Sequence, residues 1–385
     1  DVPLPDQDPF YAVPGHIAHL RGGKILRSRA VATFAGSVLP MPARAWQVQY
    51  KSLSTMGRPT ADVATILVPT APWQGRGRRP LVSYQTAEDG VGSKCSPSYA
   101  LRGGTQAVGD NSQGETAIMR QALGQGMAIV APDYEGPRSA FLGAAGQADA
   151  VLDGIRAALA FNPAGLGPRT PIAMWGYSGG SIATVFAATA QRRYAPNLHF
   201  AGIALGGLVT DARATLDDFA NIGGGGAIIV GLVGINRAYP SRHLTRYLSA
   251  TARRDMANSQ TDCLGDAIAK YPGLQVSQVE AYPGAIDSPG ATAIFHLISP
   301  WWQPGVPAAP IYDYHATGDE FAPISGDRRL MHRFCNAGVA VEHVEAAVGE
   351  HISEVVTGAQ GVLDYLTARF NGQPAPNNCA TIPRN

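Results

Sequence analysis

The stretch from Pro171 to Ala190 constrains the fold more than any other part of this chain. An apolar run of strand length leads into a tight turn and then into an Ala-rich segment of good helix formers, and the turn has the sequence Gly176-Tyr177-Ser178-Gly179-Gly180. A serine at the tip of such a turn has a strained backbone, and the residues two before and two after it come too close to carry side chains. Gly176 and Gly180 meet that requirement. Ser178 is therefore predicted to be a nucleophile.

The residue after the serine is predicted to take part in the same chemistry. The N–H of Gly179 falls at the predicted start of the helix, where it is expected to face a developing oxyanion. Because 45 of the 385 residues are glycine, a chance match to Gly-x-Ser-x-Gly is the alternative. The pattern occurs once, between a strand pattern and a helix pattern, and this context favours the nucleophile interpretation.

Strand and helix patterns alternate along most of the chain after a proline-rich arm at residues 1–45, which is expected to lie on the surface. Strands are predicted at residues 46–54, 62–70, 81–85, 127–132, 172–175, 200–205, 311–315 and 339–345. Helices are predicted at residues 115–123, 147–161, 325–336 and 352–370 and after the turn at Ser178. The first two strands are expected to pair in antiparallel fashion. The fold class is therefore α/β, with a mostly parallel sheet and helices on both faces.

The alternation stops between residues 209 and 300, which are predicted to form an inserted, mostly helical cap or lid. The core is then made of residues 1–208 and 301–385. Four glycines, Gly223 to Gly226, precede an apolar run at residues 227–235. No strand pattern leads into these glycines and their spacing is irregular, so a dinucleotide site is not expected.

Charge and hydropathy exclude several classes of partner. The 30 basic and 29 acidic residues give a formal net charge of +1, and no long charge run exists, so nucleic acid is not an expected partner. The longest apolar stretch, residues 227–235, is far shorter than the roughly 20 residues of a transmembrane helix. The chain begins at Asp1, without methionine, as expected for a secreted protein after removal of a signal peptide.

The four cysteines include no Cys-x-x-Cys pair, so a zinc cluster is not expected and two disulfides are. Of the three connectivities, the favoured one joins Cys335 to Cys379, within the C-terminal region, and Cys95 to Cys263, which ties the insertion to the core. No metal site and no cofactor are predicted.

A serine hydroxyl needs an imidazole to take its proton and a carboxylate to orient that imidazole. In parallel-sheet hydrolases the chain order is serine, acid, histidine. Asp319 follows a late predicted strand and His351 follows the last one, so they are the predicted partners of Ser178. Glu320 and Glu350 are the alternatives for the acid. Other candidates lie in strand or helix patterns or in the insertion and are expected to be structural or solvated: Asp313, His343, His332, His296 and His243.

Four segments carry a resemblance to a known family: Gly-Tyr-Ser-Gly-Gly at 176–180, Ser-Tyr-Gln-Thr-Ala-Glu-Asp at 83–89, Tyr-His-Ala-Thr-Gly-Asp-Glu at 314–320, and Glu-His at 350–351. From about residue 40 to 370 the chain resembles the secretory lipases typified by Candida antarctica lipase A, a branch of the α/β-hydrolases. The resemblance implies a triad of Ser178, Asp319 and His351, oxyanion N–H groups at Asp89 and Gly179, and a helical cap before the acid-bearing strand.

The expected function is hydrolysis of carboxylic esters by a secreted serine hydrolase, a triacylglycerol lipase acting on acylglycerol or other esters at a lipid–water interface. A short-chain carboxylesterase and an acyltransferase are the alternatives, followed by a peptidase and a non-catalytic binding module. The apolar run at 227–235 is expected either to form the core of the insertion or to line a path for acyl chains, with Ile228, Ile229 or Val230 facing that path.

Overall fold

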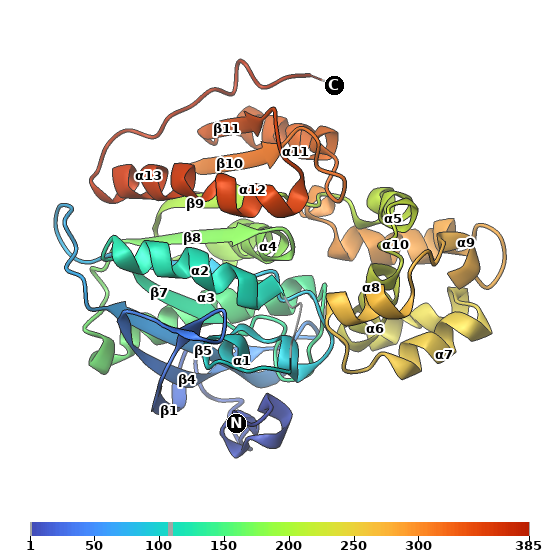
Figure 1. Cartoon of the computed structure of the whole chain (residues 1–385), viewed down its shortest axis with the longest axis horizontal. Coiled ribbons are helices and arrows are strands. Elements are labelled where there is room, and N and C mark those ends of the chain that lie inside the picture. The colour runs from blue at the N-terminus through green and yellow to red at the C-terminus, as the bar shows by residue number, and fades with distance from the viewer. Residues whose placement is uncertain (1, 107–110, 385) are drawn as a thin grey trace.

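The computed structural model describes residues 2–106 and 111–384, and its main element is a nine-stranded sheet in the order β1-β4-β5-β7-β6-β8-β9-β10-β11 (Figure 1). Neighbouring strands from β7 to β11 in this order are parallel, whereas the pairs β1–β4, β4–β5 and β5–β7 are antiparallel. The strands are β1 (Ile25–Val31), β4 (Ala43–Leu53), β5 (Pro59–Pro69), β6 (Leu81–Gln85), β7 (Ala128–Pro132), β8 (Ile172–Tyr177), β9 (Phe200–Gly206), β10 (Ile311–Ala316) and β11 (Val341–Ala346). β2 (Phe34–Ala35) and β3 (Leu39–Pro40) form a separate pair. The predicted mostly parallel sheet is confirmed.

Helices cover both faces of the sheet, which is why β6, β7 and β8 are buried along their whole length. Residues of α3, α4 and α11 pack in one apolar core, and residues of α2 and α13 pack in the core on the opposite face. The helices of the sheet region are α1 (Pro97–Leu101), α2 (Asn111–Gly124), α3 (Ala144–Ala160), α4 (Gly179–Tyr194), α11 (Ile324–Asn336), α12 (His351–Thr357) and α13 (Ala359–Phe370).

Two features differ from the sequence analysis. The expected surface arm contains β1, which pairs with β4 at the edge of the sheet. Its side chains are half-buried or exposed and include Arg27 and Arg29, so it lacks the apolar face that identifies a strand in a sequence. The single closing helix predicted for residues 352–370 is two helices, α12 and α13. They meet at Gly358, where an added Cβ would lie 2.3 Å from the ring of Tyr314.

The residues between β9 and β10 contain six α-helices among those described, and no strand of the main sheet. These are α5 (Ala212–Asn221), α6 (Gly226–Ala238), α7 (Ala250–Asn258), α8 (Leu264–Lys270), α9 (Val276–Val279) and α10 (Pro289–Ile298), and here they are called the helical insertion. The helical insertion lies to one side of the sheet (Figure 1) and has its own apolar cluster, which includes Ile229 and Val230. In the described part of the chain, every helix is too short or too polar to cross a bilayer.

Candidate active site

Ser178 lies in the turn between β8 and α4 with a backbone that few residues other than glycine adopt, at φ 52° and ψ −123°. Two close approaches explain the flanking glycines. A Cβ at Gly176 would lie 2.3 Å from the carbonyl oxygen of Gly180, and a Cβ at Gly180 would lie 2.0 Å from that of Gln85. The N–H of Ser178 donates to the carbonyl of Gly206 at 2.9 Å, which fixes the turn against β9. The hydroxyl is thereby presented at the end of the strand.

The structure brings Ser178, His351 and Asp319 together, although 173 positions separate the serine from the histidine. Nε2 of His351 lies 2.7 Å from Oγ of Ser178, and Nδ1 lies 2.7 Å from Oδ2 of Asp319. The hydroxyl of Tyr177 donates to the carbonyl oxygen of His351 at 2.6 Å. The position of the imidazole is therefore fixed by contacts to its backbone carbonyl and to both ring nitrogens. The imidazole lies between the serine and the carboxylate, as proton transfer from a serine requires.

Asp319 is held as a carboxylate by its own loop and by His351. Its Oδ1 accepts hydrogen bonds from the N–H groups of Phe321 at 3.0 Å and Ala322 at 2.7 Å. Burial raises the pKa of Asp319, but the hydrogen bond and charge of His351, the charge of His315 and the hydrogen bond from Ala322 together bring that pKa below its ordinary value. An ionised acid beside Nδ1 favours the tautomer in which Nε2 faces the serine without a proton.

The two rival acids contact backbone instead of the imidazole. Oε2 of Glu320 accepts the backbone N–H of His351 at 3.2 Å. Glu350 caps α12, accepting from the N–H groups of Ile352 at 2.7 Å and Ser353 at 2.8 Å. Both side chains support the position of His351, and neither orients its ring.

The two residues whose N–H groups are predicted to face an oxyanion, Asp89 and Gly179, line the same cavity as Ser178. Gly179 is the first residue of α4, whose first-turn N–H groups have no acceptor within the helix. The carboxyl group of Asp89 packs against Gly179, where an added Cβ would lie 1.8 Å from Oδ1, so only glycine fits. Burial raises the pKa of Asp89 to about 6, although a hydrogen bond from Asn111 to Oδ2 (3.2 Å) and the charge of His351 oppose the rise.

The loop that carries Asp89 is fastened to the helical insertion. Cys95 and Cys263 form a disulfide, and Cys335 pairs with Cys379, which is the expected connectivity. The carbonyl of Asp89 accepts the N–H of Leu264 at 2.8 Å, and Gly90 bridges Cys263 in antiparallel fashion.

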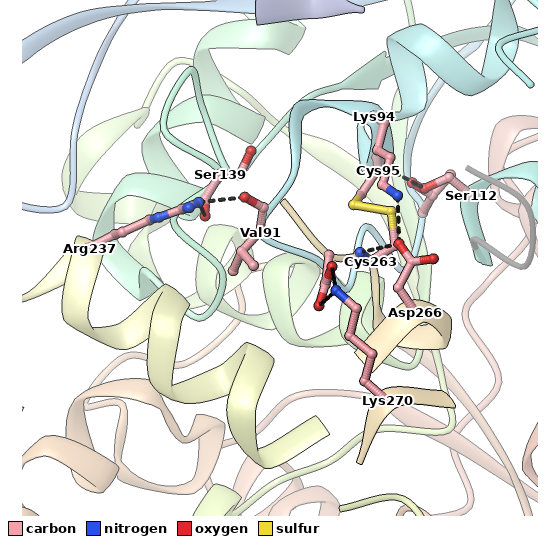
Figure 2. Close-up of a disulfide and its surroundings, with 11 residues drawn as sticks. Val91, Lys94, Cys95, Ser112, Ser139, Arg237, Cys263, Asp266 and Lys270 are labelled. Atoms are coloured by element: carbon pink, nitrogen blue, oxygen red, sulfur yellow. Dashed lines mark hydrogen bonds and ion pairs between the residues drawn. A yellow bond between two sulfur atoms is a disulfide. The ribbon is translucent and has the colours of Figure 1, made fainter. Parts of the chain in front are cut away.

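Two charged side chains add to this attachment. Figure 2 shows Lys94 reaching Asp266, at 2.6 Å, and Arg237 of α6 donating to the carbonyl of Val91, at 2.5 Å. The position of Asp89 therefore depends on the insertion as well as on β6.

A cavity of about 480 Å³ opens onto the serine, and its lining is mostly apolar. Ser178, Asp89 and His351 form its polar end, and the helical insertion supplies much of the rest, including Phe219, Ile228, Gly231, Leu232, Ile235 and Phe295. Of the three candidates expected to face an acyl path, Ile228 lies on the lining. Ile229 and Val230 are fully buried in the core of the insertion.

Two residues of α2 that were not predicted to belong to the site, Glu115 and Asn111, support the loop at residues 86–89. Oε1 of Glu115 accepts the N–H of Ala87 at 2.7 Å, and Oε2 accepts the hydroxyl of Tyr84 at 2.9 Å. Burial raises the pKa of Glu115 to about 8. No local pattern marks these residues, because their contacts are with a strand and a loop far away in the chain.

Comparison with known proteins identifies the family of this chain. Residues 101–378 match the model of the secretory lipase family. Lipase A of Arthroderma benhamiae is 32% identical over 403 residues, covering 99% of this chain and 83% of its own. A Mycobacterium tuberculosis protein described as a probable inactive lipase is 33% identical over 380 residues, covering 96% of this chain and 83% of its own.

Among solved structures, Candida antarctica lipase A in its closed state superposes with a TM-score of 0.90 at 28% identity, covering 99% of this chain and 90% of its own. The α/β-hydrolase fold is thereby confirmed. This chain belongs to the secretory lipase family.

Proposed function

We propose that this protein is a secreted lipase that hydrolyses esters of long-chain carboxylic acids, acylglycerols foremost, through an acyl-enzyme on Ser178. One observation carries the proposal: His351 bridges the hydroxyl of Ser178 and the carboxylate of Asp319 at 2.7 Å each, at the polar end of an apolar cavity. Because one relative is described as a probable inactive lipase, family membership alone does not assign activity, and the proposal depends on this arrangement of the three residues.

In the proposed reaction Oγ of Ser178 attacks the ester carbonyl while Nε2 of His351 takes the hydroxyl proton. Asp319 stabilises the imidazolium that results, and the N–H groups of Asp89 and Gly179 donate to the oxyanion. His351 then gives its proton to the leaving alcohol. Water, deprotonated by the same nitrogen, attacks the acyl-enzyme and releases the carboxylic acid and Ser178.

The apolar lining of the cavity is the observation that supports a preference for esters with long acyl chains. Burial of each CH₂ group contributes about 0.8 kcal/mol, so an apolar lining gains affinity with every methylene that it covers. We further propose that residues 209–300 act as the cap over this cavity, with residues 1–208 and 301–385 as the core. The helical insertion supports this division, since it has its own apolar cluster and lines the cavity above Ser178. The two disulfides and the family support secretion.

Labelling and kinetics test the proposal together. A fluorophosphonate probe should label the intact chain at Ser178, and Ser178→Ala should abolish both labelling and ester hydrolysis. With p-nitrophenyl esters from C2 to C16, kcat/KM should rise with acyl length beyond C8. A maximum at C2 to C4 would show a short-chain esterase instead. Absence of labelling in folded protein would place this chain with non-catalytic members of its family.

A further inference from the structure

A second group of ionisable side chains is buried behind the loop that carries Asp319. Asp313 and His315 lie on β10, Asp327 on α11 and His343 on β11, and each is at most 5% exposed. Residues 313 and 315 of a strand point to the same face, and Asp313 is directly opposite His343 in the register of β10 and β11. α11 covers that face of the sheet, which encloses the group.

Several atoms of this group have no donor to satisfy them. Within the described residues, neither oxygen of Asp327 receives a hydrogen bond, and Oδ1 of Asp313 and Nδ1 of His315 have no partner. A buried carboxylate without donors destabilises the fold unless a cation or a proton neutralises it. The group is therefore neutralised either by a bound cation or by a proton held between the carboxylates.

The outward nitrogens of both imidazoles are already engaged. Nε2 of His315 lies 2.6 Å from the carbonyl oxygen of Ala322, to which it donates. Nε2 of His343 donates to Oε1 of Glu345 at 2.8 Å, and Arg328 holds Glu345 with two bonds of 2.7 Å. In metal sites a histidine ligand ordinarily donates its second N–H to a carbonyl or carboxylate in this way. The two Nδ1 atoms face the carboxylates: that of His343 is hydrogen-bonded to Oδ2 of Asp313, and that of His315 has no hydrogen-bond partner among the described residues.

The distances suit a small tetrahedral ion. Ligand atoms of Asp313, Asp327 and His343 all lie within 4.8 Å of one another. Oδ2 of Asp327 is 3.6 Å from Nδ1 of His315 and 3.7 Å from Nδ1 of His343. Zinc bonds of 2.0–2.1 Å at the tetrahedral angle place neighbouring ligand atoms about 3.4 Å apart. Movements of a few tenths of an ångström would bring Asp327 and the two imidazoles to that spacing. Oδ2 of Asp313 is hydrogen-bonded to Nδ1 of His343, so these two atoms would have to separate for the ion to enter between them.

We propose that Asp313, His315, Asp327 and His343 form a closed structural site for a divalent transition-metal ion, zinc being the ion that suits two imidazoles and two carboxylates. The ion ties β10, β11 and α11 together, elements that lie side by side in Figure 1. Nε2 of His315 is 3.4 Å from Oδ2 of Asp319, so the site lies directly behind the catalytic acid without touching a reacting atom. Sequence analysis predicted no metal site, because these ligands have no recognisable spacing.

Metal content of the full chain tests the proposal. Protein produced in zinc-supplemented medium, desalted and analysed by inductively coupled plasma mass spectrometry, should hold about one zinc ion per chain. Asp327→Asn, which removes a ligand but keeps the side-chain shape, should lose it. Restoring zinc at 100 times its dissociation constant to chelator-treated wild type should raise Tm by about 3 °C, and this measurement needs no variant.

His351→Ala is the matched control, since it removes the other buried imidazole that contacts a carboxylate, and it should keep its zinc. A chain without zinc whose Tm does not respond to it would overturn the proposal, because a proton shared between Asp313 and Asp327 would then neutralise the group. Equal zinc content in wild type and folded Asp327→Asn would also overturn it, as would loss of the ion in His351→Ala.

Discussion

Replacing Gly231 by leucine should shorten the acyl chain that the enzyme accepts without harming the fold. Gly231 lies in α6 and lines the cavity, and a Cβ added there would meet only Cδ1 of Leu142, at an ordinary 3.8 Å. The four carbons of the leucine side chain would occupy space that about four methylenes of a long acyl chain otherwise fill. At about 0.8 kcal/mol for each buried CH₂, the loss is roughly 3 kcal/mol, or about 200-fold in kcat/KM for a C16 ester.

Short esters should be unaffected, because an acetyl or butyryl group ends close to Ser178. Stability should not fall, since leucine is a better helix former than glycine by about 0.8 kcal/mol. The assay is kcat/KM for p-nitrophenyl esters from C2 to C16, with Tm measured for each variant.

Gly234 of the same helix is the matched control. An added Cβ there would lie 2.4 Å from the carbonyl oxygen of Phe141, so Gly234→Ala should lower Tm and reduce all substrates together. If Gly231→Leu also reduced every ester in proportion, the assignment of the cavity as the acyl path would be wrong.

Three further outcomes are expected. Asp319→Asn should lower kcat by about 10⁴, because an amide at this position favours the wrong tautomer of His351. Glu320→Gln alters only a contact with the backbone of His351, so this variant should retain activity within about tenfold. If the kinetic assay gave the reverse order, Glu320 would be the acid. Burial raises the pKa of Asp89 to about 6 from the ordinary 3.8, so the folded protein binds this proton more tightly, and the resulting stability is lost as pH rises from about 4 to 6. Unfolding experiments should therefore show Asp89→Asn gaining about 2 kcal/mol relative to wild type between pH 4 and pH 7, and a constant difference would contradict the raised pKa. Replacing Cys95 and Cys263 by alanine opens a loop of 168 residues, and in the chain-entropy account this lowers the free energy of unfolding by up to about 5 kcal/mol. The variant should also lose about tenfold or more in kcat, because the loop that carries Asp89 is no longer tied to the insertion. An unchanged kcat in the folded variant would show that backbone hydrogen bonds alone hold this loop.

Sequence patterns predicted those parts of the fold that depend on neighbouring residues. The turn at Ser178 was predictable because close backbone approach excludes side chains at Gly176 and Gly180, whatever the rest of the chain does. The strand at residues 81–85 was predicted with its observed bounds. β1 escaped prediction because an edge strand needs no apolar face.

Contacts between side chains that are distant in the sequence were harder to predict from sequence patterns. Chain order suggested Asp319 and His351, but only the structure shows that Nδ1 of His351 faces Asp319 while Glu320 and Glu350 bond to backbone. Adjacent residues in a loop differ in direction, and that direction depends on packing from elements far away in the sequence.

By itself the sequence determined the strand–turn–helix at Ser178, the parallel sheet and the interruption after its fourth parallel strand, because each follows from local backbone preference and hydrophobic period. Only the tertiary structure decided that Ile228 rather than Ile229 faces the cavity, that the Asp89 loop is fastened to the insertion, and that Asp313, Asp327 and His343 are buried beside one another. These arrangements arise where segments separated by tens or hundreds of residues pack together, and burial and contact distance are then set by the whole fold.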